Sequence, residues 1–213
     1  MHSLLNNKWT KVFVFALALL PLAFLLWRYR HDNLTANPIE FITHATGDWT
    51  LRFLVFTLAI TPLRKILGLP ELIRFRRMLG LFAFFYACLH FTTYIWLDKF
   101  FDVSEVWKDV AKRKYITVGF SAFLLLIPLA ITSTKGWIRR LGGKRWQQLH
   151  RAIYFSAVFG VIHYYWLVKS AVLKPLFYGL LVGILLLWRL AVWIGKRKPR
   201  VPVSATPQTS LRA

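Results

Sequence analysis

Residues 78–97 read MLGLFAFFYACLHFTTYIWL, a stretch without a formal charge that contains one imidazole, that of His90. A helix needs about 20 mostly apolar residues to cross the hydrocarbon core of a bilayer. Five further segments have a similar apolar character, and we predict membrane spans at 9–29, 47–63, 115–133, 153–168 and 175–194 as well. The sequence therefore predicts an all-α integral membrane protein, a bundle of six transmembrane helices.

The composition agrees with a membrane protein. Hydrophobic residues make up 57% of the chain and charged residues only 17%, which is too apolar for a soluble domain of 213 residues. A net charge of +21 is typical of a nucleic-acid-binding protein, but the basic residues fall between the apolar segments. We therefore interpret them as topology signals and contacts with anionic membrane lipids, and we expect no nucleic-acid partner.

The distribution of basic residues predicts the orientation. The segments at one end of the predicted spans hold twice as many Lys and Arg residues as those at the other end, where most acidic residues lie. By the positive-inside rule the richer end, which includes both termini, is cytoplasmic. The first span is followed by WRYR at 27–30 without a small-residue cleavage site, so we expect an uncleaved anchor. We predict one membrane domain at 1–195 and a basic, disordered cytoplasmic tail at 196–213.

Two histidines lie at matching depths in the predicted bundle. We predict that the helix with the apolar segment 153–168 begins around Arg145, so it carries both His150 and His163. His90 follows Arg77, and His163 follows His150, by the same number of residues, so both lie about 20 Å from the cytoplasmic end of their helices. Two parallel helices can then supply both axial ligands of one b-type haem, because neutral imidazole binds haem iron well. The C-x-x-C-H signature of covalent haem attachment is absent, so ligation and packing would hold the group. In the alternative interpretation, each imidazole only hydrogen-bonds a neighbouring helix.

His150 and two arginines mark a second level, near the cytoplasmic end. A second haem there would use His150, while the helix that carries His90 offers Arg76 and Arg77 at that depth, which can pair with haem propionates. The alternative is a hydrogen-bonded His150 at the membrane interface. His44 precedes the predicted second span, where it caps the helix, contacts a cofactor or docks a partner. We find no internal sequence repeat.

The pattern predicts transmembrane electron transfer through haem. No Gly-x-Gly-x-x-Gly follows a strand pattern, so the electrons come from membrane quinol or from a separate cytoplasmic flavin reductase. Two other classes remain open. A transporter or channel would use His90 and His163 as a proton or metal pathway and would carry acidic residues inside the spans, where we expect none. A non-redox scaffold would use the two histidines only for packing.

Three sequence blocks carry a family resemblance. They are RRMLGL at 76–81 leading to His90, LAITS at 129–133, and WQQLHR at 146–151 leading to IHY at 162–164. Over nearly the whole chain to residue 194, the sequence resembles the MsrQ family. These are the haem-binding membrane subunits of the periplasmic methionine sulfoxide reductase system, within the ferric reductase and NADPH oxidase transmembrane superfamily. The resemblance implies a ferric reductase-like bundle in which His90 and His163 bind an outer haem. It also implies that the chain is an electron-transfer subunit rather than the catalytic one.

The resemblance implies further properties. His150 matches the superfamily's inner ligand on the fifth span, whereas the inner histidine of the third span has no counterpart here. One haem b is therefore implied, and a second stays open. FMN is a further implied cofactor, and the implied location is the bacterial inner membrane. The implied partner is the soluble periplasmic molybdopterin enzyme MsrP, which reduces methionine sulfoxide in oxidised proteins. Terminal ferric reductase is the nearest rival function within the superfamily.

Overall fold

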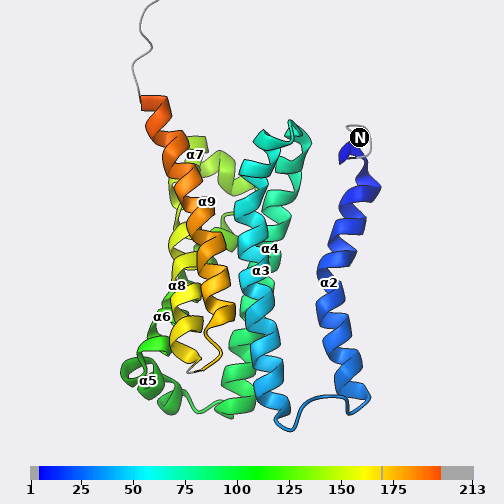
Figure 1. The fold of residues 1–213 in the computed structure, drawn as a ribbon, viewed down its shortest axis with the longest axis vertical. Coiled ribbons are helices and arrows are strands. Elements are labelled where there is room, and N and C mark those ends of the chain that lie inside the picture. Colours follow the sequence, from blue (N-terminus) through cyan, green and yellow to red (C-terminus); the bar gives the residue numbers. More distant parts are fainter. Residues whose placement is uncertain (1–4, 169, 198–213) are drawn as a thin grey trace, which may run out of the picture.

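The computed structural model describes residues 5–168 and 170–197 (Figure 1). Within these residues the chain is helical and contains no β-strand. The helices are α2 (Lys8–Arg30), α3 (Pro38–Ile66), α4 (Ile73–Thr93), α5 (Val103–Lys112), α6 (Lys114–Ile131), α7 (Lys135–Leu149), α8 (Ala152–Leu167) and α9 (Leu173–Arg197), with a 3-10 turn at Pro70–Leu72 and a π-helical turn at Tyr94–Asp98. The all-helical prediction is confirmed. Residues 198–213 of the predicted tail lie outside the described residues.

In the described part of the chain, four helices are long and apolar enough to cross a membrane: α2, α6, most of α9, and the segment Pro70–Asp98 that contains α4. The apolar α8 has only 16 residues, and α3 has 29 but includes charged side chains. Figure 1 shows α3, α4, α6, α8 and α9 running side by side, with α7 at one end and α5 at the other. The fold is therefore a bundle of membrane type, from which α2 stands apart with only Ala18 buried.

The helix α3 begins well before its predicted start. The Asn37 side chain accepts a hydrogen bond from the Glu40 backbone N–H, and Pro38 occupies the first turn, where its missing N–H costs nothing. The predicted start at residue 47 is therefore wrong, because the capping residues lie in a polar stretch that hydropathy does not detect. His44 lies inside the helix and does not cap it.

The predicted fifth helix is interrupted. The helix α7 ends at Leu149 and α8 begins at Ala152, with His150 and Arg151 in the turn between them. A kink divides α7 at Gly142, where φ is 72° and ψ is 151°, a left-handed conformation that glycine adopts without steric cost. The interpretation that placed His150 and His163 on one continuous helix is therefore wrong, and His150 is positioned by α7 and the turn that follows it.

Packing between α3 and α4 forms the aromatic centre of the bundle. The Phe53 ring of α3 stacks on Phe82 and Tyr86 of α4, with ring centroids 5.5 and 5.2 Å apart. The buried Tyr86 hydroxyl donates a hydrogen bond to the Ala18 carbonyl oxygen of α2 (2.9 Å) and accepts one from the Leu22 N–H (3.2 Å). One hydroxyl thus inserts into the backbone of α2 and connects this peripheral helix to the bundle.

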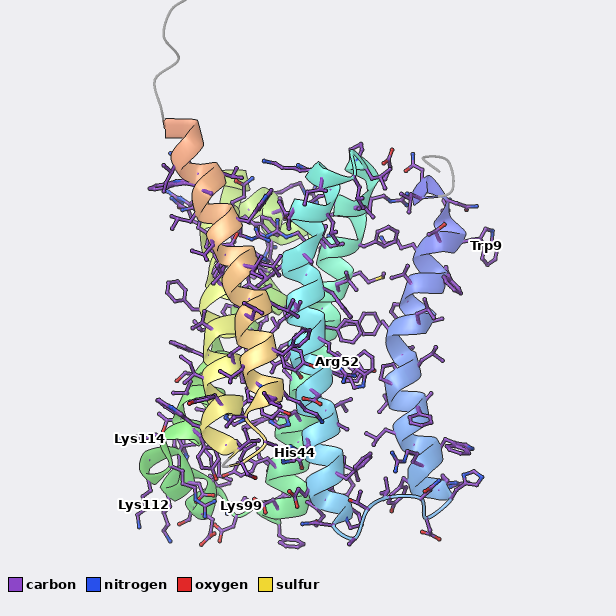
Figure 2. The ribbon with its side chains drawn as sticks, viewed as in Figure 1. Trp9, His44, Arg52, Lys99, Lys112 and Lys114 are labelled. Atoms are coloured by element: carbon purple, nitrogen blue, oxygen red, sulfur yellow. The ribbon has the colours of Figure 1, made fainter. Side chains whose placement is uncertain are left out.

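A cluster around Asp109 connects the turn after α4 to α5. Lys99 Nζ lies 2.8 Å from Asp109 Oδ2, Arg113 Nε lies 3.1 Å from Oδ1, and the Tyr94 hydroxyl donates to Oδ2 (3.1 Å). Burial favours a neutral carboxyl, but the hydrogen bonds from the lysine and tyrosine and the charge of the arginine outweigh it and lower the pKa of Asp109. Figure 2 shows Lys99 at the end of the bundle that carries α5. The cluster therefore fixes α5 against the bundle.

We expect Tyr86→Phe to loosen α2 while the rest of the bundle keeps its fold. The change deprives Ala18 and Leu22 of a buried hydrogen-bond partner, at a cost of about 1–3 kcal/mol. Hydrogen exchange of the detergent-solubilised protein measures the effect, and the amides of α2 should exchange about tenfold faster. Tyr29→Phe, at an exposed position of the same helix, is the matched control. Unchanged protection of α2 would contradict this role of Tyr86.

The Asp109 cluster predicts an acid-sensitive α5. Because the folded-state pKa of Asp109 is lowered, its stabilising contribution is present above its unfolded pKa of about 3.9 and is lost as the pH falls through the folded value. We expect protection of the α5 amides to fall below about pH 4 in the wild type. In Asp109→Asn it should be reduced already at neutral pH. Hydrogen exchange, corrected for its intrinsic pH dependence, measures the protection of the α5 amides in both proteins. Asp32→Asn, at an exposed position, is the control. If Asp109→Asn and Asp32→Asn gave the same dependence of protection on pH, the cluster would not be what stabilises α5.

Candidate functional site

His90 of α4 and His163 of α8 meet inside the bundle. Their ring centroids are 6.1 Å apart and their planes are inclined by 76°. Metal–imidazole bonds are about 2.0 Å long, so two imidazoles that bind one ion from opposite sides have centroids about 6 Å apart. The fold thus brings the two depth-matched histidines together at a separation that suits one shared metal ion.

Each of the two imidazoles is held by a backbone carbonyl. The Nδ1–H of His90 donates to Thr43 O of α3 (2.9 Å), and the Nδ1–H of His163 donates to Tyr115 O at the start of α6 (2.7 Å). A carbonyl oxygen can only accept, so Nδ1 carries the proton in both rings and Nε2 keeps the lone pair that binds a metal. Such a hydrogen bond fixes the orientation and raises the basicity of a metal-binding histidine. If the two histidines served only to hydrogen-bond neighbouring helices, their Nδ1 atoms would have a role, but their Nε2 atoms would have none.

Two adjoining cavities surround the imidazoles. One, of about 110 Å³, is lined mainly by apolar side chains of α3, α4, α6 and α8, and the other, of about 470 Å³, extends towards α5. His44, His90 and His163 line both of them. The larger cavity also contacts polar side chains, namely Asn37, Glu40, Tyr94, Asp98, Arg113 and Tyr115. An apolar cavity that opens towards polar side chains suits a porphyrin, whose ring is apolar and whose propionates are charged.

The ligand set agrees with a porphyrin rather than a bare metal ion. Across residues 5–168 and 170–197, no group of three or more His, Cys, Asp or Glu side chains is placed to hold a metal ion. His90 and His163 supply two ligands, and a porphyrin supplies those that remain. With Nδ1 anchored, Nε2 free and apolar walls around them, the two imidazoles fit an iron porphyrin.

Three polar residues of α3 lie beside this site. His44 lines both cavities and its Nε2 lies 3.9 Å from Glu40 Oε1. Asp48 lines the smaller cavity with a side chain that is 20% exposed, and Arg52 lies 3.9 Å from it while donating to the Tyr178 hydroxyl (3.1 Å). Figure 2 shows Arg52 on α3, between the two ends of the bundle. The expectation of spans without acidic residues is therefore wrong, since Asp48 lies inside a helix of the bundle.

His150, Arg76 and Arg77 line a separate cavity of about 220 Å³ near α7. The Thr132 hydroxyl donates its own proton to a carbonyl of α6, so it accepts from His150 Nε2–H at 3.1 Å. The imidazole also stacks on Trp146, with centroids 3.9 Å apart. Burial, and then the positive charge of Arg76, lower the pKa of His150 to about 4, so the ring is neutral at physiological pH. The three predicted residues come together, but His150 is hydrogen-bonded at the nitrogen that stays free in the outer pair.

Sequence reasoning missed several residues of the site. The carbonyls of Thr43 and Tyr115 gave no signal, because every residue carries a backbone carbonyl. Arg113 and Asn37 stood among many polar residues between predicted spans, with nothing to mark their contact with a cavity. Asp48 did carry a signal, since an acid at the edge of an apolar segment is costly in a bilayer and indicates function.

Comparison with known proteins gives a consistent family. A family model described as the ferric reductase like transmembrane component matches residues 12–161. A relative from Herminiimonas arsenicoxydans is 58% identical over 192 residues, which cover 89% of this chain and 88% of the relative. Relatives from Azospira oryzae and Rhodospirillum rubrum are 52% and 50% identical, covering 92% and 88% of this chain and 84% and 90% of their own.

All three relatives carry the same name, protein-methionine-sulfoxide reductase heme-binding subunit MsrQ. The identity is high and extends over most of both chains, and the matched part includes the helices that carry Thr43, His90 and Tyr115. The chain therefore belongs to the MsrQ family of heme-binding subunits, within the ferric reductase-like transmembrane proteins.

Proposed function

We propose that this chain transfers electrons across the bacterial inner membrane through b-type haem and delivers them to a periplasmic molybdopterin reductase of the MsrP type. The observation that carries the proposal is the pair of imidazoles, 6.1 Å apart, each anchored at Nδ1 and free at Nε2. Membership of a family of heme-binding subunits supports it. The chain is then the electron-transfer subunit, and its partner reduces methionine sulfoxide in oxidised proteins.

Haem iron, when bound, supplies a one-electron couple. The chain's own residues do the rest. His90 and His163 would hold the iron through Nε2, the carbonyls of Thr43 and Tyr115 hold the imidazole rings, and the apolar walls would exclude water and so tune the potential. At the polar end of the larger cavity, Arg113 offers a cation for haem propionates.

We infer six membrane spans, in which α3 and α8 join the four long apolar helices, with both termini cytoplasmic. In support, α7 with its exposed basic residues lies at the same end of the bundle as the start of α2 and the end of α9. The cavity beside the imidazole pair extends towards α5, at the opposite end. Electrons thus leave on the periplasmic side. The division into a membrane domain at 1–195 and a tail stays a prediction.

The electron donor is membrane quinol or a separate cytoplasmic flavin reductase. Exposed lysines and arginines of α7 offer a docking surface for an acidic reductase, which would make the reduction rate salt-dependent. FMN, implied by the family resemblance, stays a predicted cofactor to which we assign no residues.

Terminal ferric reductase is the second candidate, favoured by the description of the matching family model. The two functions differ in the electron acceptor. Stopped-flow mixing of the reduced haem protein with ferric citrate, and separately with an MsrP-type reductase, distinguishes them. Fast oxidation by the reductase and slow oxidation by ferric citrate is the expected result, and the reverse would establish the second candidate.

We expect the purified wild type to show the Soret band and low-spin spectrum of bis-imidazole haem b. His90→Ala and His163→Ala should each lose this low-spin spectrum, because each removes one of the two imidazoles that would hold the iron. His31→Ala is the matched control, since His31 Nδ1 also bonds a carbonyl, that of Trp27 at 2.8 Å, but lies on the exposed end of α2. Reduced-minus-oxidised spectra measure the outcome, and spectra unchanged in both site variants would reject the proposal.

The inner cavity predicts the haem stoichiometry. Because His150 Nε2 is engaged by Thr132, we expect one haem per chain and an outer-haem spectrum that survives His150→Ala. The pyridine haemochrome assay on purified protein measures the ratio. Two haems in the wild type, falling to one in His150→Ala, would instead show an inner haem with Arg76 and Arg77 as the candidate propionate partners.

A further inference from the structure

Two glycines face the imidazole rings. A Cβ at Gly47 of α3 would lie 3.1 Å from His90 Cε1 and 3.2 Å from its Nδ1. A Cβ at Gly119 of α6 would lie 2.5 Å from His163 Nδ1 and 2.9 Å from its Cγ. Carbon atoms in ordinary contact are about 3.5–4.0 Å apart. Gly119 therefore has no room for a side chain, and Gly47 has room only if the His90 ring shifts.

The glycines and the anchoring carbonyls share one register. Thr43 stands four residues before Gly47, and Tyr115 stands four residues before Gly119. In an α-helix the Cβ of a residue points back over the preceding turn, beside the carbonyl four residues earlier. That carbonyl already accepts the helical N–H and has a second lone pair for a donor that approaches from the side. Because glycine has no Cβ, the Nδ1–H edge of an imidazole can reach this carbonyl oxygen.

We propose that Gly47 and Gly119 are positioning residues for the haem ligands, an inference that rests on the proposed haem ligation. The bundle builds the same arrangement twice: α3 holds the imidazole of α4, and α6 holds that of α8. These two helix pairs are also the most extensively packed in the described structure. Each glycine lets one imidazole reach the carbonyl that fixes its tautomer, and its close approach to the ring restricts the ring plane. The two glycines together thereby set the 76° between the ring planes.

Small residues also occur between helices simply because they let backbones approach. Two other glycines represent that simpler role. A Cβ at Gly80 of α4 would lie 3.5 Å from Thr57 Cγ2, an ordinary contact between α4 and α3, and a Cβ at Gly179 of α9 would lie 3.4 Å from Val161 Cγ1 of α8. Neither glycine contacts an imidazole or lines the two cavities beside the imidazole pair, so both serve as packing controls.

The experiment compares Gly47→Ala and Gly119→Ala with Gly80→Ala and Gly179→Ala. Haem is titrated into each apo protein to obtain its affinity, and electron paramagnetic resonance gives the g values of the ferric form, which depend on the angle between the imidazole planes. Gly119→Ala should weaken haem binding about 10–100-fold, as loss of an outer-shell partner of a metal-bound histidine does. Gly47→Ala should weaken it less and shift the g values. The two controls should keep the wild-type affinity and g values even where the melting temperature falls.

The inference is overturned if the wild type shows bis-imidazole haem but both site variants match the controls in affinity and g values. Should Gly119→Ala fail to yield folded protein by size-exclusion chromatography, Gly47→Ala decides the question alone, because its contact requires only a small shift of His90. A wild type without the haem spectrum rejects the proposed function itself, so the two failures are distinguishable.

Discussion

The hydrogen bonds from His90 and His163 to backbone carbonyls are the interactions on which the rest of the structure depends. Burying a polar ring inside a membrane-type bundle costs free energy unless the ring is hydrogen-bonded. One hydrogen bond from the Nδ1–H of each ring offsets this cost and leaves Nε2 available for a metal ion. The carbonyls belong to Thr43 and Tyr115, so α3 must lie beside α4, and α6 beside α8, in one register only. The pairing of the helices is thus inseparable from the geometry of the site.

The two ends of the bundle are chemically different. Near α5 two imidazoles face each other across cavities that lead to polar side chains. Near α7 a single imidazole, that of His150, is stacked on Trp146 and bonded to Thr132, with two arginines in the same cavity. Among the described residues, two facing imidazoles therefore occur at one level, near α5. At the other level the two arginines favour anions over a second pair of nitrogen ligands.

The sequence contained part of this arrangement. His90 and His163 were predictable because an ionisable side chain is conspicuous in an apolar span and the rise of a helix converts residue numbers into depth. The early start of α3 at Pro38, which Asn37 caps, and the break after Leu149 were not predictable, because capping residues and turns lie in polar stretches without periodicity. The contacts of Gly47 and Gly119 join segments distant in sequence, so the twofold repetition of the site exists in space and not as a sequence repeat.

Two helix pairs of the bundle are packed most extensively, α3 with α4 and α6 with α8, and each pair contributes one imidazole. A haem ligated by both imidazoles, as proposed above, would link these two pairs, which contact each other less extensively than the helices within each pair do. Because a ligand that binds only the folded state stabilises that state, bound haem would then contribute to the stability of the bundle as well as to electron transfer.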